Sequence, residues 1–189
     1  MKLLLILISL LTLTSEMRFS KHGKWIIDSS SRLLIHGKSN VNSFTCSISC
    51  YNRADTLHYT IESGEFIFGN NTMMIPVQDF DCGNTMITKD LRRTVKAVKN
   101  PHLIITFISM DRNSSPGANA QMAITLAGVT KYTSIEFIQH TKDGLLQLTG
   151  KHLVSFKDFG LVPPKHVLGL VRVQKELNVE FNLLIKTVE

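Results

Sequence analysis

The C-terminal stretch Leu177-Asn178-Val179-Glu180-Phe181-Asn182-Leu183-Leu184-Ile185 alternates between apolar and polar residues, and only Leu184 breaks the alternation. A period of two places the apolar side chains on one face of a β-strand, whereas a helix would scatter them around its axis. Such a strand must bury its apolar face. Because most of the remaining chain predicts further strands, the question is what a set of long amphipathic strands encloses.

The first residues have the layout of a secretory signal peptide. Met1 and Lys2 give a positive start, an apolar run follows from Leu3 to Leu13, and polar residues come next. The run is too short to span a bilayer, which needs about 20 residues. We expect residues 1–16 to be a signal peptide and the mature protein to be periplasmic or secreted. The alternative is a buried N-terminal helix or a short anchor.

Residues 17–189 suit one domain with a sizeable core. The full chain has a formal net charge of +6, which is mildly basic. We expect no nucleic-acid partner, because no Lys/Arg cluster is interleaved with the aromatic residues that a nucleic-acid groove requires. No later apolar run reaches spanning length, so we also expect no integral membrane span in the mature chain.

Three cysteines, Cys46, Cys50 and Cys82, suggest one disulfide and one free thiol in an exported protein. On a strand, Cys46 and Cys50 would share a face at a separation of roughly 13 Å, which is beyond disulfide reach. A disulfide would therefore join Cys82 to one of the other two. The sequence has no CxxC pair, and its seven histidines are dispersed, so we expect no metal site and no cofactor.

One stretch has helical periodicity. Its apolar residues are spaced by four, four and three: Ile87, Leu91, Val95 and Val98. We predict an amphipathic helix from Thr88 to Lys99, with Thr88 as the N-cap and Leu91, Val95 and Val98 facing inward. Its basic face, which includes Arg92, could meet a membrane or a phosphate group, but we interpret it as a solvated face.

Alternating apolar residues predict strands on both sides of this helix. Eight or more strands with short connections indicate an antiparallel arrangement, either a closed barrel or a sandwich. A barrel of about eight strands can hold one small ligand, whereas a sandwich fills its middle with side chains. Periodicity does not decide between the two.

We find no catalytic motif of the GxSxG, HExxH, Walker or GxGxxG type, and we expect no enzyme activity. If the barrel closes, one apolar face of each strand points inward. An apolar interior suits a lipid chain, because burial contributes about 0.8 kcal/mol per CH₂ group. The alternative is an interior that is simply a packed core.

Several short motifs resemble the YceI-like family of exported lipid-binding proteins, in its Bacteroidetes-type variant. They follow the order of the family from Trp25 to Val188: Trp25-Ile26-Ile27-Asp28, Ser39-Asn40-Val41-Asn42-Ser43-Phe44-Thr45-Cys46, Phe80-Asp81-Cys82-Gly83, Ala127-Gly128-Val129-Thr130-Lys131 and Asp158-Phe159-Gly160-Leu161. The chain departs from the family at Asn100-Pro101, where the family has Tyr-Pro.

The resemblance implies an all-β fold: an eight-stranded antiparallel, lipocalin-like barrel with one amphipathic helix packed beside it. It implies a long-chain isoprenoid or fatty-acyl lipid in the barrel interior and no known catalysis. A homodimer is also possible. Since two family-like segments each carry one cysteine, we predict a disulfide between Cys46 and Cys82.

We expect the ligand to contact apolar side chains on the inward faces of the strands. These are Phe181, Val179, Leu183, Ile135, Phe137, Leu148, Leu103, Ile105 and Phe107. The function expected is a periplasmic carrier or binding protein for such a lipid. The alternative is an exported stress-response scaffold, or an uncharacterised enzyme, whose barrel interior is only packed core.

Overall fold

The structure is a computed structural model that describes residues 21–48, 51, 53–69, 71–112, 117–166 and 170–188. The expected signal peptide, residues 1–16, and Cys50 lie outside the described residues. The strands are β1 (Lys21–Ile27), β2 (Arg32–Lys38), β3 (Ser43–Ile48), β4 (Thr56–Glu62), β5 (Glu65–Phe68), β6 (Thr72–Pro76), β7 (His102–Asp111), β8 (Gly117–Leu126), β9 (Val129–Lys142), β10 (Leu145–Ser155), β11 (Lys165–His166), β12 (Val171–Arg172) and β13 (Glu176–Val188). The helices are η2 (Val77–Asp79), α2 (Thr85–Thr94) and η3 (Phe156–Phe159).

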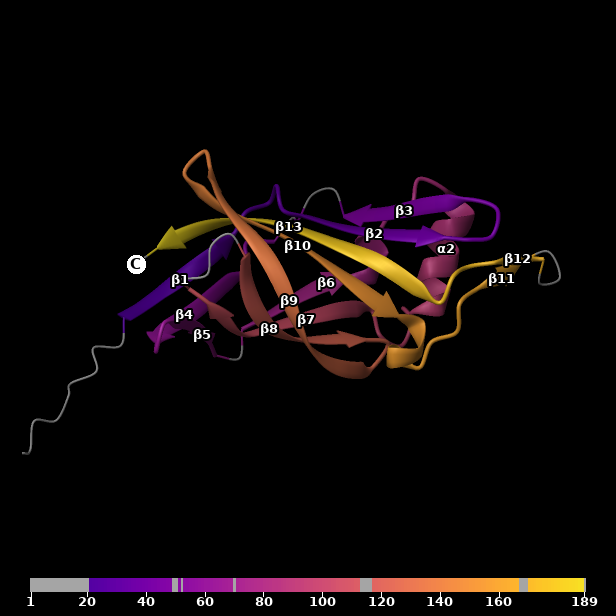
Figure 1. Ribbon diagram of the computed structural model, residues 1–189. Helices are drawn as coiled ribbons and strands as arrows, with labels where there is room; N and C mark the ends of the chain where they lie inside the picture. Colours follow the sequence, from indigo (N-terminus) through magenta and orange to yellow (C-terminus); the bar gives the residue numbers. More distant parts are fainter. Residues whose placement is uncertain are drawn as a thin grey trace, which may run out of the picture.

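Eight of these strands form a closed antiparallel barrel in the order β1, β4, β5, β7, β8, β9, β10 and β13 (Figure 1). The barrel closes because β13 pairs with β10 on one side and with β1 on the other. The predicted eight-stranded barrel is confirmed, and the sandwich alternative is wrong.

The C-terminal strand β13 has the alternation that its sequence predicts, and it continues beyond the predicted stretch at both ends. Phe181, Leu183 and Ile185 are buried, whereas the residues between them are partly exposed. Its first half pairs with β2, with Asn178 opposite His36, and its second half pairs with β1. This one strand therefore connects three neighbours.

The side chain of Ser31 fills the break between β1 and β2, at the point where β13 changes partner. The Asp28 backbone N–H donates to the Leu184 carbonyl at 2.8 Å. The Ser31 hydroxyl accepts from the Leu184 N–H at 3.0 Å and donates to the same carbonyl at 3.3 Å. Ser31 is 3% exposed, so a hydroxyl inside the fold replaces strand pairing at the Leu184 backbone.

The strands β1, β4 and β5 lie toward the barrel end opposite α2 (Figure 1), and they carry a cluster of aromatic side chains. Trp25, Tyr59, Phe66 and Phe68 pack with ring centroids from 4.9 to 6.4 Å apart, mostly tilted or edge to face. Phe107 extends this aromatic cluster toward the middle of the barrel, with its centroid 5.6 Å from that of Phe68. This end of the barrel is a packed core.

The helix α2 begins earlier and ends earlier than the sequence predicts. Its N-cap is Asn84, whose side-chain oxygen accepts from the Met86 N–H at 2.9 Å and from the Ile87 N–H at 3.2 Å. Thr88 is not the cap: it lies inside the first turn, and its hydroxyl donates to the Asn84 carbonyl at 2.9 Å. Lys96 has a φ of 55°, a left-handed conformation that stops the helix.

This early end changes the orientation of one predicted core residue. Val95 is buried and Leu91 is partly buried, as the helical spacing predicts. Val98 is 100% exposed, so its predicted inward orientation is wrong. The basic face is exposed to solvent, as interpreted from the sequence, at every basic residue except Arg92, which is partly buried and whose guanidinium donates to the Gln78 carbonyl in η2 at 2.7 Å.

Candidate functional site

The sheet has a seam beside α2: β3, at the end of the strand order, and β6, which pairs with β7, do not pair with each other within the described residues. The backbones of Ser47 and Asp81 exchange two hydrogen bonds across this seam, at 2.8 and 3.0 Å. The residues next to Ser47 and Asp81 in the sequence, Cys46 and Cys82, form a disulfide. This is the pair that the family resemblance implies. The Cys82 N–H also donates to the Thr88 hydroxyl at 3.1 Å, which attaches α2 to the seam.

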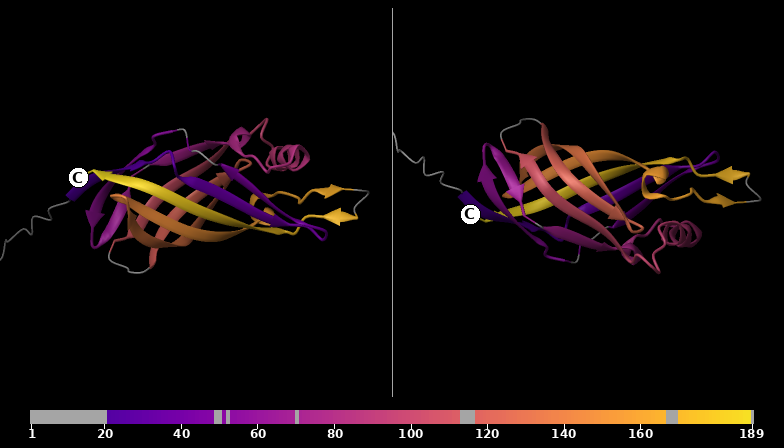
Figure 2. Two further views of the ribbon diagram at one scale, coloured as in Figure 1. Left: turned by 90° about the horizontal axis from the view of Figure 1, so that it is seen from above. Right: turned by 90° about the horizontal axis from the view of Figure 1, so that it is seen from below.

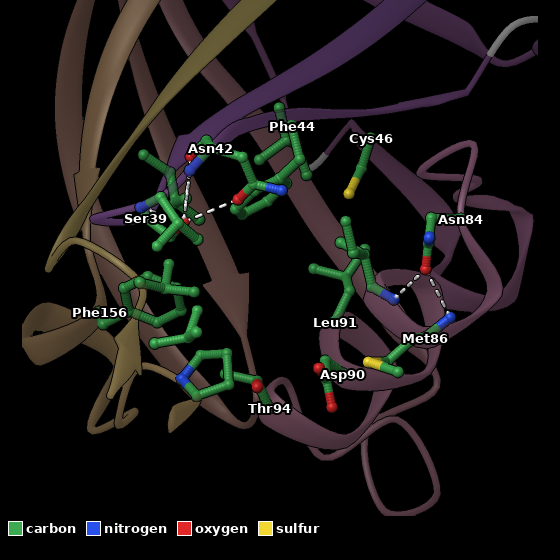
Figure 3. Close-up of a pocket in the computed structure, with 17 residues that line it drawn as sticks. Ser39, Asn42, Phe44, Cys46, Asn84, Met86, Asp90, Leu91, Thr94 and Phe156 are labelled. Atoms are coloured by element: carbon green, nitrogen blue, oxygen red, sulfur yellow. Dashed lines mark hydrogen bonds between the residues drawn. The ribbon is translucent and has the colours of Figure 1, made fainter. Parts of the chain in front are cut away.

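An outer cavity of about 300 Å³ opens next to this seam, between α2, the β2–β3 hairpin and the segment that leads into β13 (Figure 3). Its floor is apolar and its rim carries a few polar groups. The lining residues are Ile35, Ser39, Val41, Asn42, Phe44, Cys46, Asn84, Met86, Ile87, Asp90, Leu91, Thr94, Phe156, Pro164, Val171, Val173 and Leu177.

The polar rim of the outer cavity offers both hydrogen-bond donors and acceptors. The Ser39 hydroxyl donates to the Asn42 side-chain oxygen at 2.7 Å, which leaves the Asn42 amide nitrogen directed into the cavity (Figure 3). Across the cavity, Asp90 is 8% exposed and accepts from Arg93 at 2.5 Å. The rim can therefore hold a small polar group while the floor holds hydrocarbon.

A middle cavity of about 80 Å³ adjoins the outer cavity. The two share four lining residues, Ile35, Leu91, Phe156 and Leu177. Its other lining side chains are apolar except for Ser155: Leu33, Val77, Phe80, Val95, Leu103, Ile105, Ile124, Leu126, Val154, Phe159, Leu161, Val179 and Phe181. A dry, apolar space of this kind favours a hydrocarbon chain over a polar ligand.

A third cavity of about 20 Å³, here called the deep cavity, adjoins the middle cavity and shares Leu33, Ile105 and Phe181 with it; the exposed Arg32 also lines it. Tyr51 lines it, and the tyrosine hydroxyl donates to the Asp55 carboxylate. Burial, strengthened by this hydrogen bond, raises the pKa of Tyr51 above its ordinary value, so the hydroxyl stays neutral. Phe107 closes the inner end, where the aromatic cluster begins.

Six of the nine residues predicted to contact the ligand line these cavities. Val179 and Leu103 line the middle cavity, Leu183 and Phe107 line the deep cavity, and Phe181 and Ile105 line both. Their contact with a ligand stays a prediction.

The other three predicted residues, Ile135, Phe137 and Leu148, are buried but line none of these cavities. Phe137 packs edge to face on Phe181, with centroids 6.2 Å apart. Its ring occupies the space where a Cβ at Gly150 would stand, 2.8 Å from the nearest ring atom. Alternation predicted the burial of these side chains, but here the interior is filled with protein.

The outer cavity contains residues that the sequence did not identify as site residues, among them Phe44, Met86 and Val171. They come from the β2–β3 hairpin, α2 and β12, which lie far apart in the sequence. The alternation of Phe44 and Cys46 marks an apolar strand face, and Ile87 belongs to the predicted helix stripe. No local pattern indicates that these faces meet around a space.

No group of three or more His, Cys, Asp or Glu side chains in the described part of the chain is placed to hold a metal ion. Within the same residues, no helix is long and apolar enough to cross a membrane.

Solved structures with the same architecture exist. BcnA from Burkholderia cenocepacia superposes with a TM-score of 0.59 at 13% sequence identity, covering 82% of this chain and 95% of that protein. A polyisoprenoid binding domain from Saccharophagus degradans, implicated in plant cell wall breakdown, gives a TM-score of 0.59 at 12% identity, covering 86% and 97%. The YceI protein of Campylobacter jejuni gives 0.50 at 16% identity, covering 65% and 74%.

The chain has the YceI-like fold. The sequence matches no protein-family model, and no curated protein matches it either. At these identities the likeness is one of fold. The YceI-like barrel is therefore established by structure, and the ligand has to be argued from the cavities of this chain.

Proposed function

We propose that this YceI-like barrel binds a single lipid chain, with the tail in the middle and deep cavities and a polar end at the rim of the outer cavity. The observation that carries the proposal is the succession of three adjoining cavities, in which each shares lining residues with the next, from the seam to Phe107. Each CH₂ group that enters contributes about 0.8 kcal/mol, so a tail supplies most of the affinity.

The lipid is an isoprenoid or a fatty-acyl chain. The solved domain from Saccharophagus degradans is a polyisoprenoid binding domain, and its barrel has the same fold. In this chain the aromatic cluster and the small deep cavity limit how far a tail can extend past Phe181. We therefore propose that the far half of the barrel stays packed and that a longer lipid extends out through the outer cavity.

The role we propose is binding or carriage outside the cytoplasm, without catalysis. A disulfide between Cys46 and Cys82 suits an oxidising compartment, and residues 1–16 have the layout of a signal peptide. The alternative of a scaffold with a packed interior describes the aromatic end of the barrel, but it leaves the apolar cavities at the mouth without a role.

Native mass spectrometry of the exported protein, purified without detergent, tests this function. We expect one lipid per protein chain, or uptake of one added fatty-acid or short polyprenol probe by protein stripped of lipid. A protein that is bare as isolated and takes up neither probe would favour the scaffold alternative. Measuring probes of increasing length separates a deep tail site, where mass uptake stops at a limiting length, from a shallow surface site.

A further inference from the structure

The most exposed large apolar side chains of the described residues surround the barrel mouth. Their exposed fractions range from 65% to 100%, and they are Val41, Met86, Val98, Tyr132, Val162 and Leu170. In the same order, they belong to the β2–β3 turn, to α2, to the turn after α2, to the start of β9, to the segment after η3 and to the position just before β12. Figure 2 shows α2, the β2–β3 hairpin and the β11–β12 hairpin together at the end opposite the C-terminus.

The same end of the molecule is basic. The segment 85–99 has five basic residues and one acidic residue, and the segment 160–175 has three basic residues and no acidic one. The turns at the opposite end carry four acidic residues, Glu62, Glu65, Asp111 and Asp143, and two basic residues, Arg112 and Lys142, so these turns have a net charge of −2. The molecule therefore has a charge asymmetry along the barrel axis, and its positive end is the mouth.

Val98 and several basic side chains line one groove on the outer side of α2. This groove has a volume of about 850 Å³, and Val98 lines it together with Arg92, Arg93, Lys96, Lys99 and Arg53. Lys96 and Lys99 are exposed and form no ion pair within the described residues. The helix thus has the outer cavity on one side and this basic groove on the other.

We propose that the mouth of the barrel docks on an anionic membrane surface. Exposed aliphatic side chains between lysines are the combination that inserts into the headgroup region while cations neutralise lipid phosphates. A nucleic acid would find no aromatic platform in the groove and would leave the exposed valine, methionine and leucine unused. Docking brings the outer cavity to the lipid surface, where a chain can pass without crossing water.

Vesicle co-flotation with the full mature protein tests this docking. The probes are vesicles of phosphatidylcholine alone and vesicles of an equal mixture of phosphatidylcholine and phosphatidylglycerol. We expect binding to the mixed vesicles only. We also expect release in high salt, since the Debye length falls from about 10 Å at 0.1 M to about 3 Å at 1 M.

Charge reversal at the mouth should remove this binding. The double variant Lys96→Glu/Lys99→Glu is expected to lower vesicle affinity roughly tenfold or more. The control Lys142→Glu/Lys186→Glu makes the same change in net charge at exposed positions on β9 and β13, away from the mouth, and should retain most of the binding. Val98→Asp should weaken binding without changing the melting temperature, because Val98 is fully exposed.

Three outcomes would overturn the proposal: no binding to either vesicle, equal binding to both, or equal loss in the mouth and control variants. The assay needs no lipid inside the barrel, so failure of the lipid-binding function and failure of docking are distinguishable.

Discussion

At the scale of single residues, the barrel depends on side chains that replace backbone pairing. Ser31 supplies both a donor and an acceptor to Leu184, where β13 changes its partner from β2 to β1. Leu184 is also the residue that breaks the alternation of the sequence. Its side chain lies on the outer face, so the break does not disturb the inward row.

Replacing Ser31 with Ala should lower the free energy of unfolding by roughly 1–3 kcal/mol, because the partly buried Leu184 N–H loses its partner. Urea denaturation followed by circular dichroism measures the loss. Ser43→Ala, at an exposed position in β3, is the control and should change stability little. An equal effect of the two substitutions would mean that the Ser31 hydroxyl does not support the break.

His152 makes stability depend on pH. Burial lowers the pKa of His152 below its ordinary value, and the ring lies 3.3 Å from the Thr133 hydroxyl. The unfolded chain therefore binds the proton first, so the stability is fully present above about pH 6.5 and falls as the pH decreases toward the folded-state pKa. Unfolding experiments across this range should show a smaller acid loss in His152→Gln, whereas His22→Gln should retain the loss.

At the scale of elements, the sequence predicts local periodicity well and end points poorly. β13 follows from its period of two alone, and the stripe of Leu91 and Val95 follows from helical spacing. The limits of α2 do not, because the cap is Asn84, four residues before the predicted cap Thr88, and Lys96 takes a left-handed conformation. The helix cap and the left-handed residue are local backbone features that the spacing of apolar residues does not predict.

An aspartate substitution should affect stability strongly on the covered face of the helix region and weakly on its exposed face. Leu91→Asp should lower stability by roughly 2–4 kcal/mol, because Leu91 lies between the outer and middle cavities and the new charge has no partner there. Val98→Asp, at a fully exposed position, should leave stability nearly unchanged. Thermal melts compare them, and similar melting temperatures would mean that α2 does not cover the mouth.

At the scale of the whole molecule, the sequence predicts which side chains face inward but not where the interior is hollow. Phe137 and Phe181 both face inward by alternation. Phe137 packs over Gly150, whereas Phe181 lines the middle and deep cavities. The difference depends on the size of the side chains on the neighbouring strand. Gly150 on β10 has no side chain, which leaves space for the ring of Phe137. The outer cavity could not be predicted from the sequence, because three segments that lie far apart in the sequence form it.

Phe181→Trp tests whether the lipid passes this position. The larger ring should fill the space that the middle and deep cavities share, so bound lipid should be shorter or less abundant in native mass spectra. The melting temperature of the empty protein should change little, because the ring enters existing space. Ile138→Trp, at a position 47% exposed on the outer side of β9, is the control. Unchanged lipid occupancy in Phe181→Trp would place the tail elsewhere.

The pairing of β1 and β2 with β13 also has a consequence for how the chain is made. These first strands cannot complete their hydrogen bonding on one side until the last strand has been synthesised, so their edges wait unpaired while the middle of the barrel forms. Closure over such a sequence separation is slow, in the range of milliseconds to seconds for comparable β-topologies. Waiting strand edges are templates for aggregation, so the chain is exposed to aggregation until its last strand pairs with its first strands.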